Sequence, residues 1–342
     1  MRLAKNQNTK DGANLMLLQN DSFENTPNAF YQAVKTLQIT KLLHMSNVRK
    51  SCGKPVGKVF QFLVLLVFQG ENLFRFLNSK HVAQAGAQKN TFYRFMDEPS
   101  YNWKRFLLLL AAKVINALRP LTNTGRVKVF ILDDSTIPRN RSKKVELLAR
   151  IFDHVSHKFV KGFTLLTLGW SDGYSFIPLT FNLLSSAKKS NRYQEISASI
   201  DHRTNGYKAR LESMLHKPDA ALRLIKSALD IGISADYVLM DTWFTTEPFI
   251  KSIQDLGLDV IGMVKQLNQS YIFHGKTYKL AQLQKSAPYK SAKECFGSLV
   301  VYTKNHHIPV KIVFVRNRNK RSECLYILST DIELSNAEIV RI

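Results

Sequence analysis

The sequence lacks the features that would mark a disulfide-rich, zinc-binding or membrane-spanning protein. Its three cysteines, Cys52, Cys295 and Cys324, are odd in number and far apart, so they imply no disulfide framework. No Cys-x-x-Cys occurs, and the paired histidines have no companion ligands at zinc-finger spacing. The longest apolar run, Val59–Phe68, is about half of the ~20 residues that a spanning helix needs, and no signal-peptide core is present. We expect a soluble, cytoplasmic protein with no membrane partner.

Positive charge is abundant. The chain has 342 residues, with 49 Lys and Arg against 26 Asp and Glu, which gives a net charge of +23. With 45% hydrophobic residues it has the composition of a folded protein, and the basic excess favours nucleic acid over an anionic membrane surface as the partner. The run Tyr101–Phe130 contains six basic residues and no acid, and Arg316–Arg321 is a basic turn. A solvated basic face is the alternative interpretation of the first run. The candidate DNA contacts in these two stretches are Lys104, Arg105, Lys113, Arg119, Arg126, Arg316, Arg318, Lys320 and Arg321.

Residues 1–125 are predicted to be a helical, DNA-binding region. Apolar residues recur at helical spacing in Phe60–Phe68 and in Trp103–Leu118, and we assign both stripes to the core. Between them, Gln88–Arg94 is expected to open a helix that faces DNA.

Residues 126–264 alternate between strand and helix signals, which predicts a mixed α/β sheet. The expected strands include Val127–Leu132 and Tyr237–Met240, and a Ser171-Asp172-Gly173 turn joins two strands as a hairpin. Helices are expected over Pro218–Ile231, with Gly232 at the C-cap, and over Phe244–Leu256. Residues 265–331 form a β-rich block.

Two of the predicted strands are each followed directly by aspartate. Asp133 and Asp134 follow Val127–Leu132, and Asp241 follows Tyr237–Met240. If the strands are neighbours, the carboxylates converge at the carboxyl edge of the sheet, and clustered carboxylates select hard cations such as Mg²⁺ or Mn²⁺. Two such ions would activate water and stabilise the leaving oxygen of a phosphodiester. On spacing alone, the alternative that Asp134 and Asp241 cap turns stays open.

Several motifs together resemble the insertion-sequence DDE transposases of the IS-four-type group, whose catalytic core is RNase H-like with a β-rich insertion. The similarity covers roughly residues 85–342. Its motifs include Asp133-Asp134-Ser-Thr, Phe152-Asp-His, Lys161-Gly, Leu168-Gly-Trp-Ser-Asp-Gly, Met240-Asp-Thr-Trp-Phe and Ile327-Leu-Ser-Thr-Asp.

By that resemblance, Asp134 and Asp241 are the catalytic, metal-binding aspartates. Asp134 is preferred because the family's aspartate directly precedes the hydroxyl residues, and Asp133 is the fallback. The resemblance further implies Mg²⁺ or Mn²⁺, double-stranded DNA with terminal inverted repeats, a homodimer on DNA, and a prokaryotic cytoplasm. The reaction would be hydrolytic nicking followed by strand transfer from the freed 3′-hydroxyl.

The end of the sequence departs from the family, whose third acid is a glutamate inside a Tyr-x-x-Arg-x-x-x-Glu arrangement. Ser335-Asn-Ala-Glu338 predicts a capping box that opens a helix, and Glu338 lacks the surrounding Tyr and Arg. We therefore expect residues 332–342 to be the truncated start of the helix that would return to the core. The third acid would then be missing, the two-ion site incomplete and catalysis impaired. The alternatives are a non-catalytic DNA-binding remnant that inhibits full-length transposase, and a generic RNase H-like nuclease.

Overall fold

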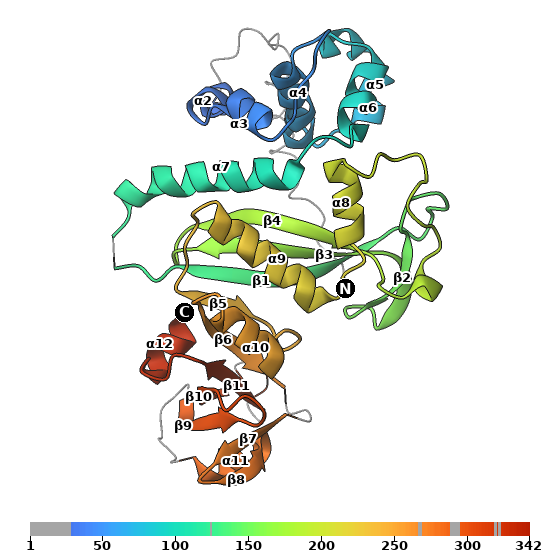
Figure 1. Ribbon diagram of the computed structural model, residues 1–342. Helices are drawn as coiled ribbons and strands as arrows, with labels where there is room; N and C mark the ends of the chain where they lie inside the picture. The colour runs from blue at the N-terminus through green and yellow to red at the C-terminus, as the bar shows by residue number, and fades with distance from the viewer. Residues whose placement is uncertain (1–28, 124, 266–268, 288–294, 318–319, 321–322) are drawn as a thin grey trace, which may run out of the picture. The chain divides into compact units, whose positions relative to one another are not determined.

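The structure is a computed structural model that describes residues 29–123, 125–265, 269–287, 295–317, 320 and 323–342. The chain divides into two compact units (Figure 1). The first contains the residues up to Phe106 together with His202–Gly206, and the second contains Leu107–Asp201 and Tyr207–Ile342. No helix in the described ranges is long and apolar enough to span a bilayer.

The first unit is helical and has an aromatic core. The Phe62 ring lies 5.1 Å from that of Phe76 and 4.7 Å from that of Phe92, measured between centroids. Phe92 belongs to a helix that begins at Lys89, inside the stretch Gln88–Arg94 that was expected to open one. The helices are α2 (Ala29–Thr36), α3 (Ile39–Met45), α4 (Val56–Phe68), α5 (Leu73–Leu77), the 3-10 turn η1 (Val82–Ala85), α6 (Lys89–Asp97) and the start of α7 (Trp103–Leu118).

The predicted burial of α4 was partly wrong. Val67 and Phe68 were assigned to the core but are 75% and 69% exposed, whereas Val59, Phe62 and Leu66 are buried. Apolar residues occupy nearly all sides of this helix, so periodicity alone does not identify its buried face.

The second unit is built on one mixed sheet, with eleven strands in the described residues. Strand β1 pairs in parallel with β5, and β5 in parallel with β6, while β1 pairs antiparallel with β3. The predicted hairpin at Ser171-Asp172-Gly173 is confirmed, because it joins the antiparallel strands β3 and β4. The strands are β1 (Val129–Pro138), β2 (Ala149–Asp153), β3 (Lys158–Ser171), β4 (Phe176–Leu184), β5 (Tyr237–Met240), β6 (Asp259–Val264), β7 (Ser270–Phe273), β8 (Lys276–Lys279), β9 (Cys295–Thr303), β10 (Pro309–Arg316) and β11 (Cys324–Ser329).

The sequence predicted that β1 ends at Leu132, directly before its aspartates, and this prediction was wrong. The strand continues through Asp133 and Asp134 to Pro138, because β3 is long enough to pair with it from Val129↔Ser171 to Pro138↔Gly162. The prediction for β5 is confirmed, since this strand ends at Met240 and Asp241 follows it.

The two faces of the sheet carry different helices. Phe130, Val238 and Val260 belong to the larger core, which also contains buried residues of α9 (Lys217–Asp230) and α10 (Glu247–Gln254). Helix α9 packs on β3 and β4 (Figure 1). On the opposite face, the neighbouring residues of the same strands pack with Ile339 of α12 (Asn336–Arg341). The remaining short helices are η2 (Arg119–Leu121), η3 (Lys189–Asn191), α8 (Asn205–Glu212) and α11 (Leu280–Ser286).

Two helix boundaries differ from the sequence prediction. Helix α9 ends at Asp230 with Ile231 as its C-cap, and the predicted Gly232 follows with a positive φ of 84°. Helix α10 begins at Glu247 rather than at Phe244, because the residues before it form the turn that follows β5.

The sheet continues beyond β6 into the β-rich block. Strand β11 pairs antiparallel with β6, and β10, β9, β7 and β8 follow in that order. The predicted fold class, a mixed α/β protein with a helical N-terminal region, is therefore confirmed.

Candidate active site

Asp133 and Asp134 lie next to each other inside β1, so their side chains leave opposite faces of the sheet. Lys217, the first residue of α9, donates to both Asp134 oxygens at 3.0 Å, which identifies the Asp134 side as that of α9. Asp133 is exposed, and its Oδ1 accepts the backbone N–H of Asp134 at 2.8 Å. The two carboxylates therefore have different surroundings.

Asp241 occupies a tightly bonded turn directly after β5. Its Oδ1 accepts the Trp243 N–H at 2.9 Å, and its backbone oxygen accepts the Thr245 hydroxyl at 2.7 Å. Thr245 is buried against Gly262 of β6, where an added Cβ would lie only 2.4 Å from the Thr245 Oγ1. The absence of a side chain at Gly262 lets the turn close over β6 and hold Asp241 at the sheet edge.

The fold brings the two aspartate-bearing strands together. In the parallel β1–β5 pair Leu132 lies opposite Met240, so Asp134 and Asp241 both follow this matched pair within two residues. The Lys217 ammonium also lies 4.8 Å from the centroid of the Trp243 ring. Asp134, Lys217 and the turn after Asp241 thus share one edge of the sheet.

His154 lies in the turn between β2 and β3. At this edge its ring contacts the ring of Trp243 and not a carboxylate of Asp134 or Asp241. Its ring centroid lies 5.8 Å from that of Trp243 and 5.1 Å from that of Phe152, in edge-to-face arrangements. These contacts position the half-exposed Trp243 beside Asp241.

The donor set at this edge suits a hard divalent cation, because carboxylate oxygens are the ligands such ions prefer. Asp134 and Asp241 would be two of the ligands. Within the described ranges, no group of three or more His, Cys, Asp or Glu side chains is placed to hold a metal ion. The fit is therefore that of a pair of carboxylates, and one of them already binds the ammonium of Lys217.

Glu338 makes the capping box that its sequence predicts. Its side chain accepts the Ser335 N–H at 2.8 Å, and the Ser335 hydroxyl accepts the Glu338 N–H at 3.2 Å. The hydrogen bonds from Ser335 hold the pKa of the Glu338 carboxyl below its ordinary value. This carboxylate is thus engaged at the start of α12.

A cavity of about 630 Å³ opens beside the turn that follows Asp241. Thr242 and Trp243 line it from that turn, Glu247 from the start of α10, and Asn305 from the turn before β10. Glu247 accepts the Asn305 N–H at 2.8 Å, which ties the two walls together. Hydrogen bonds from His306, Thr303 and Asn305 outweigh burial and lower the Glu247 pKa.

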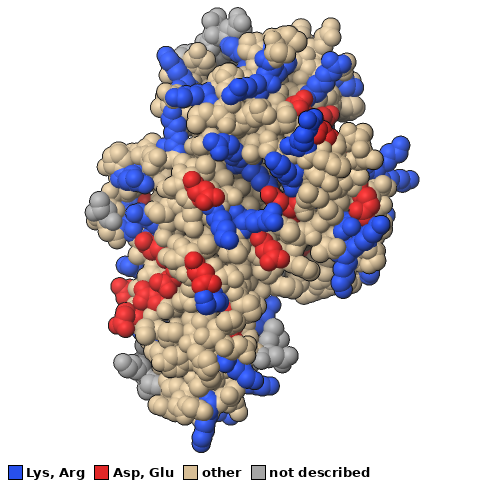
Figure 2. All heavy atoms as spheres, in the orientation of Figure 1, with Lys and Arg blue, Asp and Glu red and all other residues tan. Residues whose placement is uncertain are grey.

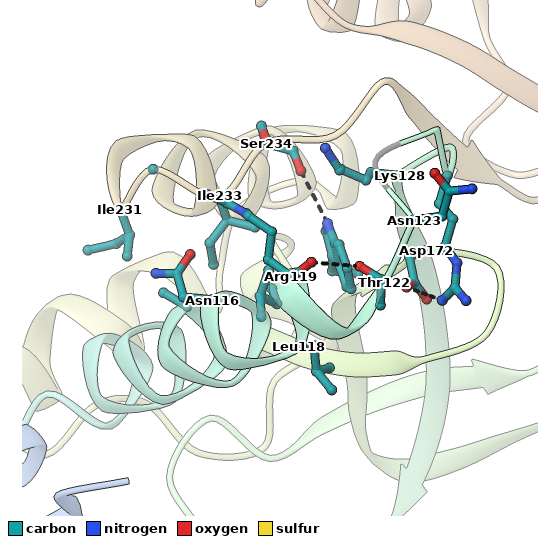
Figure 3. A pocket seen from close by; sticks show the side chains of 15 residues that line it. Asn116, Leu118, Arg119, Thr122, Asn123, Lys128, Asp172, Ile231, Ile233 and Ser234 are labelled. Atoms are coloured by element: carbon teal, nitrogen blue, oxygen red, sulfur yellow. Dashed lines mark hydrogen bonds and ion pairs between the residues drawn. The ribbon is translucent and has the colours of Figure 1, made fainter.

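Of the candidate DNA contacts, Arg126 already has an acidic partner. Its guanidinium lies 3.0 Å from Asp172 in the β3–β4 turn and 4.1 Å from the centroid of the Tyr174 ring. Arg119 and Arg126 line a small pocket of about 50 Å³, in which Trp170 donates to the Ser234 oxygen (Figure 3). Burial opposes ionisation of Asp172, but hydrogen bonds from Ser175, Arg126 and Tyr174 hold its pKa below the ordinary value.

The other basic candidates are placed as follows. Arg105 is exposed and donates to the Met45 oxygen at 3.2 Å, and Arg119 is exposed at the start of η2. Lys320 forms an ion pair with Glu323. Lys104, Lys113 and Arg316 are partly exposed, and Arg318 and Arg321 lie outside the described residues. Figure 2 shows Lys and Arg side chains spread over the visible face rather than gathered in a single patch.

Sequence reasoning did not identify three residues that shape this edge: Lys217, Thr245 and Gly262. Lys217 is 83 positions from its partner Asp134, and no local pattern predicts such a contact. The one available signal was the nearby Pro218, which marks a helix start but not the direction of the preceding side chain.

Comparison with known proteins agrees with this architecture. A family profile described as DDE superfamily endonuclease matches residues 77–284, which is more than half of the chain and includes both aspartate-bearing strands. No curated protein matches the chain. The match and the mixed sheet together establish that this chain belongs to the DDE superfamily of endonucleases.

Proposed function

We propose that the chain is a transposase of the IS-four-type group, which cuts and joins double-stranded DNA at the ends of an insertion sequence. One observation carries this proposal. Asp134 lies in β1 and Asp241 directly follows β5, and these two strands pair in parallel in a chain that belongs to the DDE endonucleases. The net charge of +23 supports a DNA substrate, because phosphate contacts depend on Lys and Arg. Such a protein would act in a prokaryotic cytoplasm, as a homodimer with one subunit at each DNA end.

Asp134 and Asp241 would bind Mg²⁺ or Mn²⁺, which in this chemistry activates water and stabilises the leaving oxygen. The turn bonds from Trp243 and Thr245 orient Asp241 before any ligand arrives. Preorganised groups of this kind contribute to catalysis because no energy is then spent in ordering them. The cavity lined by Thr242 and Trp243 opens beside the turn that holds Asp241, which supports a substrate site at this edge of the sheet.

The expected impairment is part of the proposal. No group of three or more His, Cys, Asp or Glu side chains in the described residues is placed to hold a metal ion, which supports slow cleavage by this chain alone.

The test is a nicking and strand-transfer assay on supercoiled DNA that carries the element's inverted repeats, with Mg²⁺ or Mn²⁺. Asp134→Asn and Asp241→Asn should each abolish nicking, while Asp230→Asn, an exposed acid at the end of α9, should leave it unchanged. Asp133→Asn tests the fallback assignment. Loss of nicking in Asp133→Asn but not in Asp134→Asn would reassign the first aspartate.

The same assay separates the alternatives. A specific gel shift with the inverted repeats but no nicking, under any metal condition, would favour a non-catalytic DNA-binding protein. Nicking without strand transfer and without dependence on the repeats would favour a generic nuclease. Nicking that survives both Asp134→Asn and Asp241→Asn would refute the proposed site.

A further inference from the structure

The ion pair between Lys217 and Asp134 occupies the atoms that a metal ion would need. The Lys217 ammonium lies 3.0 Å from each oxygen of the Asp134 carboxylate, so both oxygens accept a hydrogen bond from it. Both side chains are mostly buried, at 21% and 18% exposure. The pair is therefore protected from the solvent screening that weakens ion pairs on the surface.

Lys217 is also held from its other side. The ammonium lies 4.8 Å from the Trp243 ring centroid and 5.8 Å from that of Phe244, within the range of cation–π attraction. The negative group and the two rings come from β1 and from the turn after Asp241. The Lys217 ammonium is thus held by contacts both with β1 and with the turn that follows β5.

A divalent cation and this ammonium exclude each other. Mg²⁺ binds carboxylate oxygens at about 2.0–2.1 Å, so an ammonium on the same two oxygens would face a strong like-charge repulsion. Lys217 must move before Asp134 can ligate a metal ion. Its flexible four-carbon stem allows the ammonium to turn toward another anion, such as a phosphate of a bound DNA.

We propose that Lys217 is a resident counter-ion of Asp134, which keeps metal binding weak until DNA is present. DNA would give the displaced ammonium a phosphate partner, so metal and DNA bind cooperatively through Lys217. This inference rests on the proposed function, since it takes Asp134 as a metal ligand. Lys217 is a positioning residue in this scheme, because it acts through Asp134.

The test measures Mn²⁺ binding to the full chain without DNA, by electron paramagnetic resonance of the free ion. Lys217→Met should tighten Mn²⁺ binding by about tenfold or more, since tenfold corresponds to the low end of the coupling between close charge pairs. The effect should vanish in an Asp134→Asn background. Lys226→Met removes an exposed charge from the same helix, so it controls for the general change in net charge and should leave affinity nearly unaltered.

Two further variants keep the test decisive if Lys217→Met folds poorly. Lys217→Arg retains the positive charge and should keep the weak affinity of the wild type, whereas Lys217→Gln should bind Mn²⁺ more tightly. A purely structural role for Lys217 would not produce this order by charge. Addition of the DNA end should tighten Mn²⁺ binding more in the wild type than in Lys217→Gln.

The outcomes distinguish the inference from the proposed function. If Mn²⁺ binding depends on Asp134 but is equal in the wild type, Lys217→Met and Lys217→Gln, the counter-ion role is refuted while the metal site stands. If no variant shows Mn²⁺ binding that depends on Asp134, with or without DNA, both the inference and the proposed metal site are wrong.

Discussion

The β3–β4 turn depends on one buried carboxylate, and its replacement has a calculable cost. Asp172 is 4% exposed and accepts three hydrogen bonds: from the N–H groups of Tyr174 and Ser175, at 3.1 and 2.7 Å, and from Arg126 at 3.0 Å. Asp172→Asn keeps an acceptor for both backbone donors but loses the charge-assisted bond to Arg126. Such bonds contribute about 1.5–3 kcal/mol, and Arg126 is 28% exposed, so we expect a loss of about 1–2 kcal/mol.

Asp172→Ala removes all three acceptor contacts and should cost about 1–2 kcal/mol more, because two backbone N–H groups lose their partner. The assay is equilibrium urea unfolding at pH 7, with hydrogen exchange at the Tyr174 and Ser175 amides as the local measurement. Glu333→Gln, which neutralises an exposed acid, is the control and should leave the unfolding free energy unchanged.

The pH dependence gives a second measurement on the same residue. The folded-state pKa of Asp172 lies below its ordinary value, so ionised Asp172 stabilises the fold at any pH above the unfolded pKa of about 3.9. That contribution is lost as the pH falls through the folded pKa. The difference between the wild type and Asp172→Asn should therefore be constant from pH 7 to about pH 5 and shrink in stronger acid. Equal stability at pH 7, or a difference that persists undiminished at low pH, would refute this reasoning.

Three other substitutions test the contacts that position the site. Gly262→Ala places a Cβ 2.4 Å from the Thr245 Oγ1, so the Thr245 hydroxyl must release the Asp241 backbone oxygen. We expect nicking to fall about tenfold or more while the circular dichroism spectrum is retained. In the control Gly125→Ala the nearest atom is 3.7 Å from the added Cβ, so activity should be unchanged. Undiminished nicking in Gly262→Ala would mean that the turn does not position Asp241. Gly162→Ala places a Cβ 2.2 Å from the Ile137 oxygen, so urea unfolding should show a loss of about 2 kcal/mol or more, and an unchanged midpoint would contradict the tight β1–β3 pairing. Ser335→Ala removes the N-cap of α12 at a cost of about 1 kcal/mol, which should appear as faster hydrogen exchange confined to that helix. Exchange at the wild-type rate would show that the packing of Ile339 alone stabilises α12.

Features governed by neighbouring residues were predictable from the sequence. The Asp172-Gly173 turn, the capping box of Ser335 and Glu338, and the end of β5 before Asp241 all depend on signals within a few positions. These elements occur where the local chemistry indicates, because turn and cap preferences act over one or two hydrogen bonds.

Features governed by distant partners were not predictable in this way. The end of β1 depends on the length of β3, and the exposure of Val67 and Phe68 depends on which side of α4 the other helices cover. Lys217 gives the clearest case for the site, since its bond to Asp134 exists only because α9 begins where β1 passes. Charge and motifs in the sequence predicted Asp134 and Asp241 as site residues but gave no sign of the Lys217 ammonium that pairs with Asp134.

The pairing of β11 with β6 has a consequence for the production of shorter fragments of this protein. A fragment that stops at residue 264 would leave β6 as an open edge, with the apolar side chains of Val260, Ile261 and Val264 along a row of unsatisfied backbone groups. Exposed edges of this kind recruit strands from other molecules. Recombinant fragments cut at this boundary should therefore form inclusion bodies, and a deletion of the later strands would need a charged or proline-bearing replacement edge to stay in solution.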